Sequence, residues 1–134
     1  MNIYETFSKP AFLDSAKTFP LSETASITLL PLTGEKSKRE FQKLMEPYTP
    51  RIKAGGTLTE TEQKSLNLRH FSETVIVGWK GITGANNEEI KFSPEAAKSL
   101  LGDPKLESFF DLIAKMASNE AGFTEAQHQE DEGN

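Results

Sequence analysis

The sequence of 134 residues contains no cysteine, and its two histidines, His70 and His128, stand far apart. The absence of cysteine excludes thiol catalysis and thiolate zinc sites, and in a chain of this size it favours a reducing compartment. The N-terminus lacks the basic patch and apolar run of a signal peptide. No stretch approaches the roughly 20 apolar residues that a membrane span requires. We therefore expect a cytoplasmic protein that does not contact membranes.

Basic side chains are outnumbered, and the imbalance lies at one end of the chain. The net charge is −5, with 15 Lys and Arg against 20 Asp and Glu. The last fifteen residues carry five acidic side chains and no Lys or Arg, so the preceding part is neutral. Because no basic block is available for phosphate contacts, nucleic-acid binding is not expected. The acidic segment 124–134 is predicted to be a disordered tail.

The sequence also lacks the usual patterns of an active site. Gly55 and Gly56 do not stand in the strand-to-helix context of a phosphate-binding loop. His70 is expected to be a partly exposed residue on a helix surface. A metal-independent hydrolase would use His70 and Glu73, which are three residues apart and have no third member. We expect no catalytic residue, no metal and no cofactor, and hence no enzyme.

Short β-prone runs near the N-terminus predict a hairpin. Phe19 lies in the first run and Ala25–Leu30 is the firmer second strand. Pro31 has no amide hydrogen, so this second strand should lie at a sheet edge or end there. The preceding residues 1–17 have no clear periodicity and are predicted to form an irregular arm, with a short helical turn at 11–17 as a further option.

Helical signals dominate the rest of the chain. Apolar residues recur at helical spacing within Lys36–Glu46, a segment that Pro47 and Pro50 should end. Thr59 and Glu62 have the spacing of a capping box, which predicts the start of a second helix. Two further helices should begin at the Ser-Pro and Asp-Pro pairs and be separated by a glycine. These pairs and the glycine are Ser93-Pro94, Asp103-Pro104 and Gly102.

The second helix is predicted from one long apolar stripe. Its members are spaced 3, 4, 4 and 3 residues apart, which suits one face of an α-helix. The β-branched run Thr74–Val77 lowers helix propensity, so a strand at 74–78 is the alternative. The length of the stripe favours the helix. The stripe consists of Leu68, Phe71, Val75, Trp79 and Ile82.

Together these patterns predict an α+β fold that is mainly helical. A short N-terminal β-hairpin should be followed by about four helices and the acidic tail. We place an irregular arm at 1–17, one globular domain at 18–123 and the tail at 124–134. Trp79 and Phe92 are expected near the core.

Several aromatic residues lie outside the regular segments. Phe7, Phe12, Phe19 and Phe123 stand where no secure core position is predicted. Such residues either fold back on their own domain or contact another protein, and we weigh the two readings evenly.

One central segment resembles a known family. Val75–Ile82, a Gly/Asn turn and then Ile90–Glu95 are similar to the central signature of the tail assembly chaperones of long, non-contractile-tailed bacteriophages. The flank Leu29–Leu32 also resembles this family, and the resemblance spans roughly residues 18–125. It implies a protein that binds the tape-measure protein, a long and largely helical chain, and keeps it soluble while the tail tube assembles.

From this resemblance we expect a prophage or phage chaperone in the bacterial host cytoplasm. Its apolar contact surface is predicted around Phe71, Trp79, Ile82 and Phe110. The tail tube protein and a second copy of the chain are further candidate partners, whereas nucleic acid and membranes are not. The alternative is a small acidic adaptor that binds and regulates a host factor, which would have the same composition.

Overall fold

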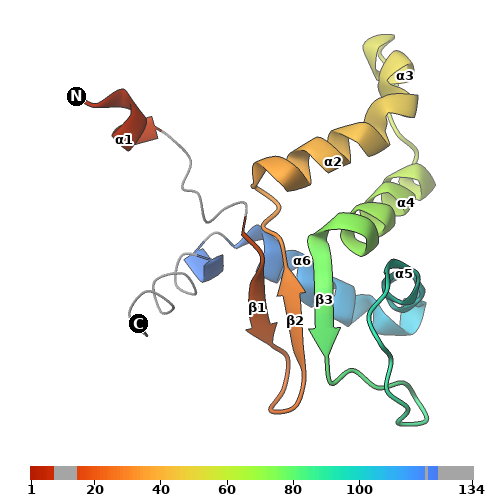
Figure 1. Cartoon of the computed structure of the whole chain (residues 1–134). Helices are drawn as coiled ribbons and strands as arrows, with labels where there is room; N and C mark the ends of the chain where they lie inside the picture. Colours follow the sequence, from red (N-terminus) through yellow and green to blue (C-terminus); the bar gives the residue numbers. More distant parts are fainter. Residues whose placement is uncertain (8–14, 120, 124–134) are drawn as a thin grey trace.

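The computed structural model describes residues 1–7, 15–119 and 121–123. A three-stranded antiparallel sheet in the order β1-β2-β3 is covered on one face by helices, so the predicted α+β class with an N-terminal hairpin and mainly helical content is confirmed. Figure 1 shows α6 crossing the sheet, with α2 and α4 at one end of it. The elements are α1 (Ile3–Phe7), β1 (Lys17–Pro20), β2 (Ser26–Leu29), α2 (Glu35–Met45), η2 (Glu46–Tyr48), α3 (Thr49–Lys53), α4 (Glu60–His70), η3 (Phe71–Val75), β3 (Ile76–Lys80), α5 (Pro94–Leu101), η4 (Pro104–Leu106) and α6 (Glu107–Ser118).

The hairpin places β2 at the centre of the sheet. Lys17 pairs with Leu29 at one end of the β1–β2 ladder, and Pro20 pairs with Ser26 at the other. Pro31 lies two residues beyond the end of β2. Of the two expected outcomes, an edge strand or a strand that ends at Pro31, the structure shows the second, and β2 is the central strand. A proline is tolerated here because it stands outside the ladder.

The helix predicted along the stripe Leu68–Ile82 is wrong beyond Val75, because residues 76–80 form strand β3. Helix α4 continues into one π-helical turn, η3, and the chain then enters β3 without a loop. A bulge explains the misleading spacing. Thr28 pairs with Gly78 but Leu29 pairs with Ile76, which leaves Val77 as an extra residue. Residues on either side of a bulge can share a face although they are three apart, which imitates helical periodicity.

The core lies between the sheet and the helices, and aromatic pairs connect its parts. The rings of Phe71 and Phe110 are 5.0 Å apart, which joins η3 to α6. Trp79 and Phe92 meet edge to face at 5.1 Å, so their predicted place near the core is confirmed. The buried members are Ile27, Leu29, Phe71, Val75, Ile76, Trp79, Ala97, Leu101, Ile113, Ala117 and Phe123.

Local capping signals predict the helix starts well. Thr59 accepts a hydrogen bond from the amide of Glu62, whose carboxylate in turn accepts one from the Thr59 amide. Ser93 caps α5 by accepting from the Ala96 amide at 3.0 Å. Helix α2 ends at Met45, as the prolines after it predict. Pro47 and Pro50 occupy the first turns of two short elements that follow, the 3-10 helix η2 and the α-helix α3.

Parts of the chain's ends lie outside the described residues. These are the predicted tail 124–134 and most of the turn expected at 11–17. The arm contains the short helix α1, and β1 already begins at Lys17. The domain boundaries stay predictions. Within the described part of the chain, no helix is long and apolar enough to cross a membrane.

Candidate functional site

The four residues predicted to contact a partner lie in or against the core. Phe71 is 6% exposed and Trp79 is 8% exposed. The Trp79 indole donates a hydrogen bond of 2.7 Å to the Ile90 carbonyl, which fixes the ring inward. Ile82 and Phe110 are partly buried and pack against the core. These side chains support the fold in this conformation, so their role in binding stays a prediction and the accessible surface lies elsewhere.

The four aromatic residues outside regular segments divide between the two readings. Phe123 is fully buried and its ring meets the partly buried Phe19 edge to face, with 5.2 Å between centroids. Phe7, by contrast, is 70% exposed. Phe12 lies outside the described residues. Phe123 is therefore a core residue and Phe7 a surface residue, a difference that the periodicity of the sequence does not indicate.

Among the described residues, exposed large apolar side chains gather at the N-terminal arm. Four lie within the first seven residues, whereas Ile52 is on α3. Two others, Val77 and Leu112, lie singly on β3 and α6. Single exposed apolar residues are ordinary, but groups of them mark interaction surfaces. The four arm residues are Met1, Ile3, Tyr4 and Phe7.

Ile52 belongs to a longer feature, here called the α2–α3 stripe: the partly exposed Leu44, Met45 and Tyr48 together with Ile52. Their spacing of one, three and four residues keeps them on one side of the helical path. No residue of η2 or α3 is buried, and the only buried residue of α2 is Ser37. Figure 1 shows α3 beyond the end of α2, far from the sheet. The stripe is thus amphipathic helix surface that the domain covers only in part.

Polar contacts hold the stripe in place. Arg51 on α3 reaches the carboxylate of Glu62 on α4, with 2.9 Å between Nη2 and Oε2. The guanidinium also lies over the Tyr48 ring, 5.5 Å from its centroid. The Arg51 hydrogen bond, helped by the backbone amide of Thr59, lowers the pKa of Glu62 from 4.5 to about 2. The ion pair therefore fixes α3 against the start of α4.

A pocket of about 260 Å³, here called the basal groove, lies between α2 and α4. Leu32, Phe41 and Phe71 supply its apolar part, and polar side chains complete the lining. The rings of Phe41 and His70 are 5.0 Å apart. The full lining is Leu32, Lys38, Phe41, Asn67, His70 and Phe71.

His70 is buried, so the expectation of a partly exposed helix-surface histidine is wrong. The physical reason is that α2 packs across α4 and covers the ring. His70 Nε2 lies 2.9 Å from the Ser37 carbonyl and 3.1 Å from the Ser37 hydroxyl. Burial lowers the pKa of His70, while the Ser37 carbonyl and the charge of Glu40 oppose this shift. The neutral ring serves as a hydrogen-bonded part of the helix interface.

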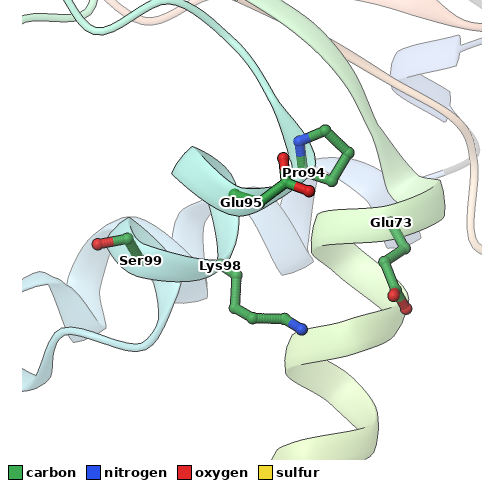
Figure 2. Close-up of a pocket in the computed structure, with 5 residues that line it drawn as sticks. All are labelled: Glu73, Pro94, Glu95, Lys98 and Ser99. Carbon is green, nitrogen blue, oxygen red and sulfur yellow. The ribbon is translucent and has the colours of Figure 1, made fainter.

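The hydrolase alternative gains no support from the geometry. A pocket of about 300 Å³ lies between η3 and α5. Figure 2 shows the side chains that line it, with Glu73 on one side and Glu95, Lys98 and Ser99 of α5 on the other. Its charged residues are exposed, and Glu73 already pairs with Arg69 at 3.3 Å. His70 does not line this pocket, because it faces α2 in the basal groove. The structure therefore does not bring Glu73 and His70 into one site.

Metal ligands are not clustered in the described ranges either. No group of three or more His, Asp or Glu side chains there could hold a metal ion. The exposed carboxylates are explained by helix starts and by ion pairs along α4, such as Lys64 with Glu60 at 3.2 Å. The expectation that the protein is not an enzyme stays a prediction.

Comparison with known proteins identifies the lineage of the chain. The family model of the YdaY prophage protein matches residues 32–134, which is well over half of the sequence. The matched region contains the α2–α3 stripe and the basal groove and begins after the hairpin. No curated protein and no solved structure matches significantly. The chain is phage-derived and belongs to the YdaY prophage protein family.

Proposed function

We propose that this protein is a tail assembly chaperone that binds the tape-measure protein and keeps it soluble in the host cytoplasm during tail-tube assembly. The membership in a prophage protein family agrees with a phage role. The resemblance over residues 18–125 supplies the finer assignment. The single observation that supports it best is the α2–α3 stripe, because apolar helix surface that lacks full cover suits a helical client.

The client's physical chemistry explains why such a surface would be useful. A long helical chain exposes apolar stripes before the tube encloses it, and exposed stripes aggregate. A small domain that covers one client stripe with its own removes that area from water, which is favourable in proportion to the area buried. The net negative charge of the chaperone would keep the complex soluble.

Stripe residues suit this task because they can change partner without unfolding the domain. Ile52 is 41% exposed and belongs to a short helix with no buried residue. Tyr48 and Met45 are partly exposed and offer an amphipathic ring and a flexible thioether, both common in binding surfaces. Binding here would leave the aromatic core undisturbed.

Co-expression with the tape-measure protein of the same prophage tests the proposal. We expect the soluble fraction of that protein to rise several-fold with the wild-type chaperone. Ile52→Asp should abolish this gain, because a carboxylate in the contact would be desolvated without a partner. Leu112→Asp is the matched control, since Leu112 is 45% exposed on α6, outside the stripe. Equal client solubility with and without the chaperone would refute the function.

The adaptor alternative makes a different prediction in the same host. A regulator of a host factor would co-purify with that bacterial protein and leave the solubility of the tape-measure protein unchanged. Affinity purification from lysogenic cells, with Ile52→Asp as the reference, separates the two functions. Recovery of the tape-measure protein by the wild type alone supports the chaperone.

A further inference from the structure

One face of α4 carries contacts that hold α2, η2 and α3 to the rest of the domain. Glu62, Leu66 and His70 stand four residues apart, so their side chains lie in one row along the helix. The carboxylate of Glu62 binds Arg51 of α3, with 2.9 Å between Oε2 and Nη2. His70 Nε2 lies 2.9 Å from the carbonyl oxygen of Ser37 on α2. The elements α2, η2 and α3, here called the lid, are thus attached to α4 near both of their ends.

An apolar side chain lies between these two polar contacts. Leu66 is only 3% exposed, yet it does not belong to the main core cluster of the domain. His70, one turn further along the same row, packs its ring on Phe41 of α2, with 5.0 Å between centroids. The lid contacts both neighbours of Leu66 in the row, so we infer that it covers Leu66 as well. The lid and α4 therefore enclose a small apolar interface of their own.

This interface buries little of the lid. Ser37 is the only buried residue of α2, and neither η2 nor α3 contains one. The side chains of Arg51 and Glu62 stay 46% and 22% exposed, and ion pairs that are open to water contribute little to stability. The polar contacts of the lid can also be replaced by hydrogen bonds to water. Segments with few buried apolar contacts open at a lower free energy than the whole domain.

Glycines stand at both ends of the lid. Before α2, the Leu32 amide donates a hydrogen bond of 2.9 Å to the Ala117 carbonyl of α6, which anchors the chain to the main core, and Gly34 then precedes the helix. After α3, Gly55 has a positive φ of 93°, and Gly56 follows it. Glycine tolerates the backbone changes that a rotation of packed helices requires. Figure 1 shows α2 and α4 side by side, with α3 at their far end.

We propose that α2, η2 and α3 move away from α4 together, as a hinged lid, and that a client helix binds the opened form more tightly than the closed form. Opening brings Leu66 and the covered side of the α2–α3 stripe to water, next to Phe71 in the basal groove. A client helix with an apolar stripe then takes the place of one side of the interface. Its binding shifts the population toward the opened form. The client part rests on the proposed function, whereas the opening does not.

Amide hydrogen exchange of the full-length protein, followed by NMR at pH 7.5, tests the opening. We expect the amides in the second half of α2 to exchange at least about tenfold faster than those of β2. Arg51→Ala should speed exchange in α2 about threefold, although the substitution lies on α3, because the lid moves as one unit. Lys43→Ala is the matched control, since the ion pair of Lys43 with Glu40 at 3.2 Å stays within α2. This variant should exchange like the wild type.

A cross-link that closes the lid tests the effect on the client. The chain has no cysteine, so a short bis-maleimide reagent can join the two thiols of Arg51→Cys/Glu62→Cys specifically. The tape-measure protein is diluted from urea into purified chaperone, and its soluble fraction is measured. Cross-linking should lower this fraction several-fold. The same variant treated with N-ethylmaleimide, which modifies both thiols without joining them, is the control and should keep the client soluble at least as well as the wild type.

Two exchange results overturn the opening. One is an α2 whose amides exchange only as slowly as those of β2, because α2 would then leave α4 only when the whole domain unfolds. The other is an effect of Arg51→Ala that is confined to α3. Equal client solubility with the cross-linked and the N-ethylmaleimide-treated protein overturns the link between opening and binding. Equal solubility with and without any chaperone instead contradicts the proposed function, and the exchange experiment still decides whether the lid opens.

Discussion

The sheet region and the α2–α3 region of this domain are stabilised in different ways. In the sheet region, strands, α5 and α6 share a continuous core with fully buried Ile27, Val75 and Ile113. In the α2–α3 region the apolar residues are only partly covered, and an ion pair and a capping box hold the helices. Burial of apolar area supplies most of the folding free energy. The sheet region therefore stabilises the fold, and the α2–α3 region is free to offer its apolar surface.

The largest contrast should appear in substitutions to alanine. Trp79→Ala removes a buried ring that packs on Phe92 and leaves the Ile90 carbonyl without its donor. We expect a loss of about 3–5 kcal/mol in the free energy of unfolding. Ile52→Ala on α3 should change it by about 0.5 kcal/mol or less. Urea denaturation followed by tryptophan fluorescence for Ile52→Ala, and by circular dichroism for both, gives the values. Similar losses of unfolding free energy in Trp79→Ala and Ile52→Ala would contradict the conclusion that the two regions contribute differently to stability.

Two glycines with positive φ, Gly81 and Gly55, allow the cost of backbone strain to be compared between the two regions. Gly81 has a positive φ of 76°, and an added Cβ would lie 2.1 Å from the Thr24 carbonyl oxygen. Gly81→Ala should cost at least about 2 kcal/mol, because strain and a clash combine. Gly55, before α4, has φ +93° and no atom within 4 Å of such a Cβ. Gly55→Ala should cost only about 1 kcal/mol, from strain alone.

Thermal denaturation of both alanine variants measures this difference. A Gly55→Ala protein that is as unstable as Gly81→Ala would mean that the connector between α3 and α4 is packed more tightly than the structure shows.

The helix interface should respond to mild acid. Burial lowers the pKa of His70 below 6.5 in the folded protein, so the unfolded chain binds the proton more readily. The contribution of neutral His70 to the free energy of unfolding is therefore fully present above pH 6.5. This contribution is lost as the pH falls below that value. The loss cannot exceed about 1.4 kcal/mol per pH unit for one group. Denaturation between pH 7.5 and 5.5 measures it.

His70→Gln is the control for this titration, because glutamine has no proton to gain in that range. The variant should be less stable than the wild type at neutral pH and should have a flatter pH dependence. A slope equal to that of the wild type would assign the effect to other groups.

The smallest expected effect concerns the ion pair of the α2–α3 region. The carboxyl of Glu62 should titrate with a pKa of about 2, well below its ordinary 4.5. Its contribution to stability is present above pH 4.5 and is lost as the pH falls toward 2. Arg51→Ala should raise this pKa, although the Thr59 amide retains part of the shift. NMR titration of the side-chain carboxyl carbon measures both values, and an unchanged pKa in Arg51→Ala would show that the ion pair is not formed in solution.

Local signals in the sequence predict local structure well in this protein. The capping box of Thr59 and Glu62 and the Ser93 cap use contacts within three residues, so spacing alone identifies them. The hairpin also follows from adjacent runs. For β3 the sequence favours a helix over the alternative strand at 74–78, because the bulge at Val77 depends on pairing with β2, almost fifty residues earlier.

The candidate site was less predictable, because exposure depends on which elements pack together. The spacing of Leu44, Met45 and Tyr48 is as amphipathic as that of a core helix, and the sequence alone does not show that α4 covers only one flank. His70 is buried by α2, whose Ser37 lies 33 residues earlier. The apolar stripe from Leu68 to Ile82 does face inward, but through a helix, a π turn and a strand.

The direct passage from α4 through η3 into β3 limits how the sequence can vary in length. The helical and the strand periodicity meet there with no loop between them. One inserted residue would therefore rotate the helix by about 100° or move each strand side chain to the opposite face of the sheet. A single insertion between Phe71 and Val75 would either rotate α4 away from α2 or turn Trp79 out to water. Insertions and deletions among relatives should therefore concentrate in the connections around Glu23, Gly55 and Asn87 and be absent from the segment 66–80.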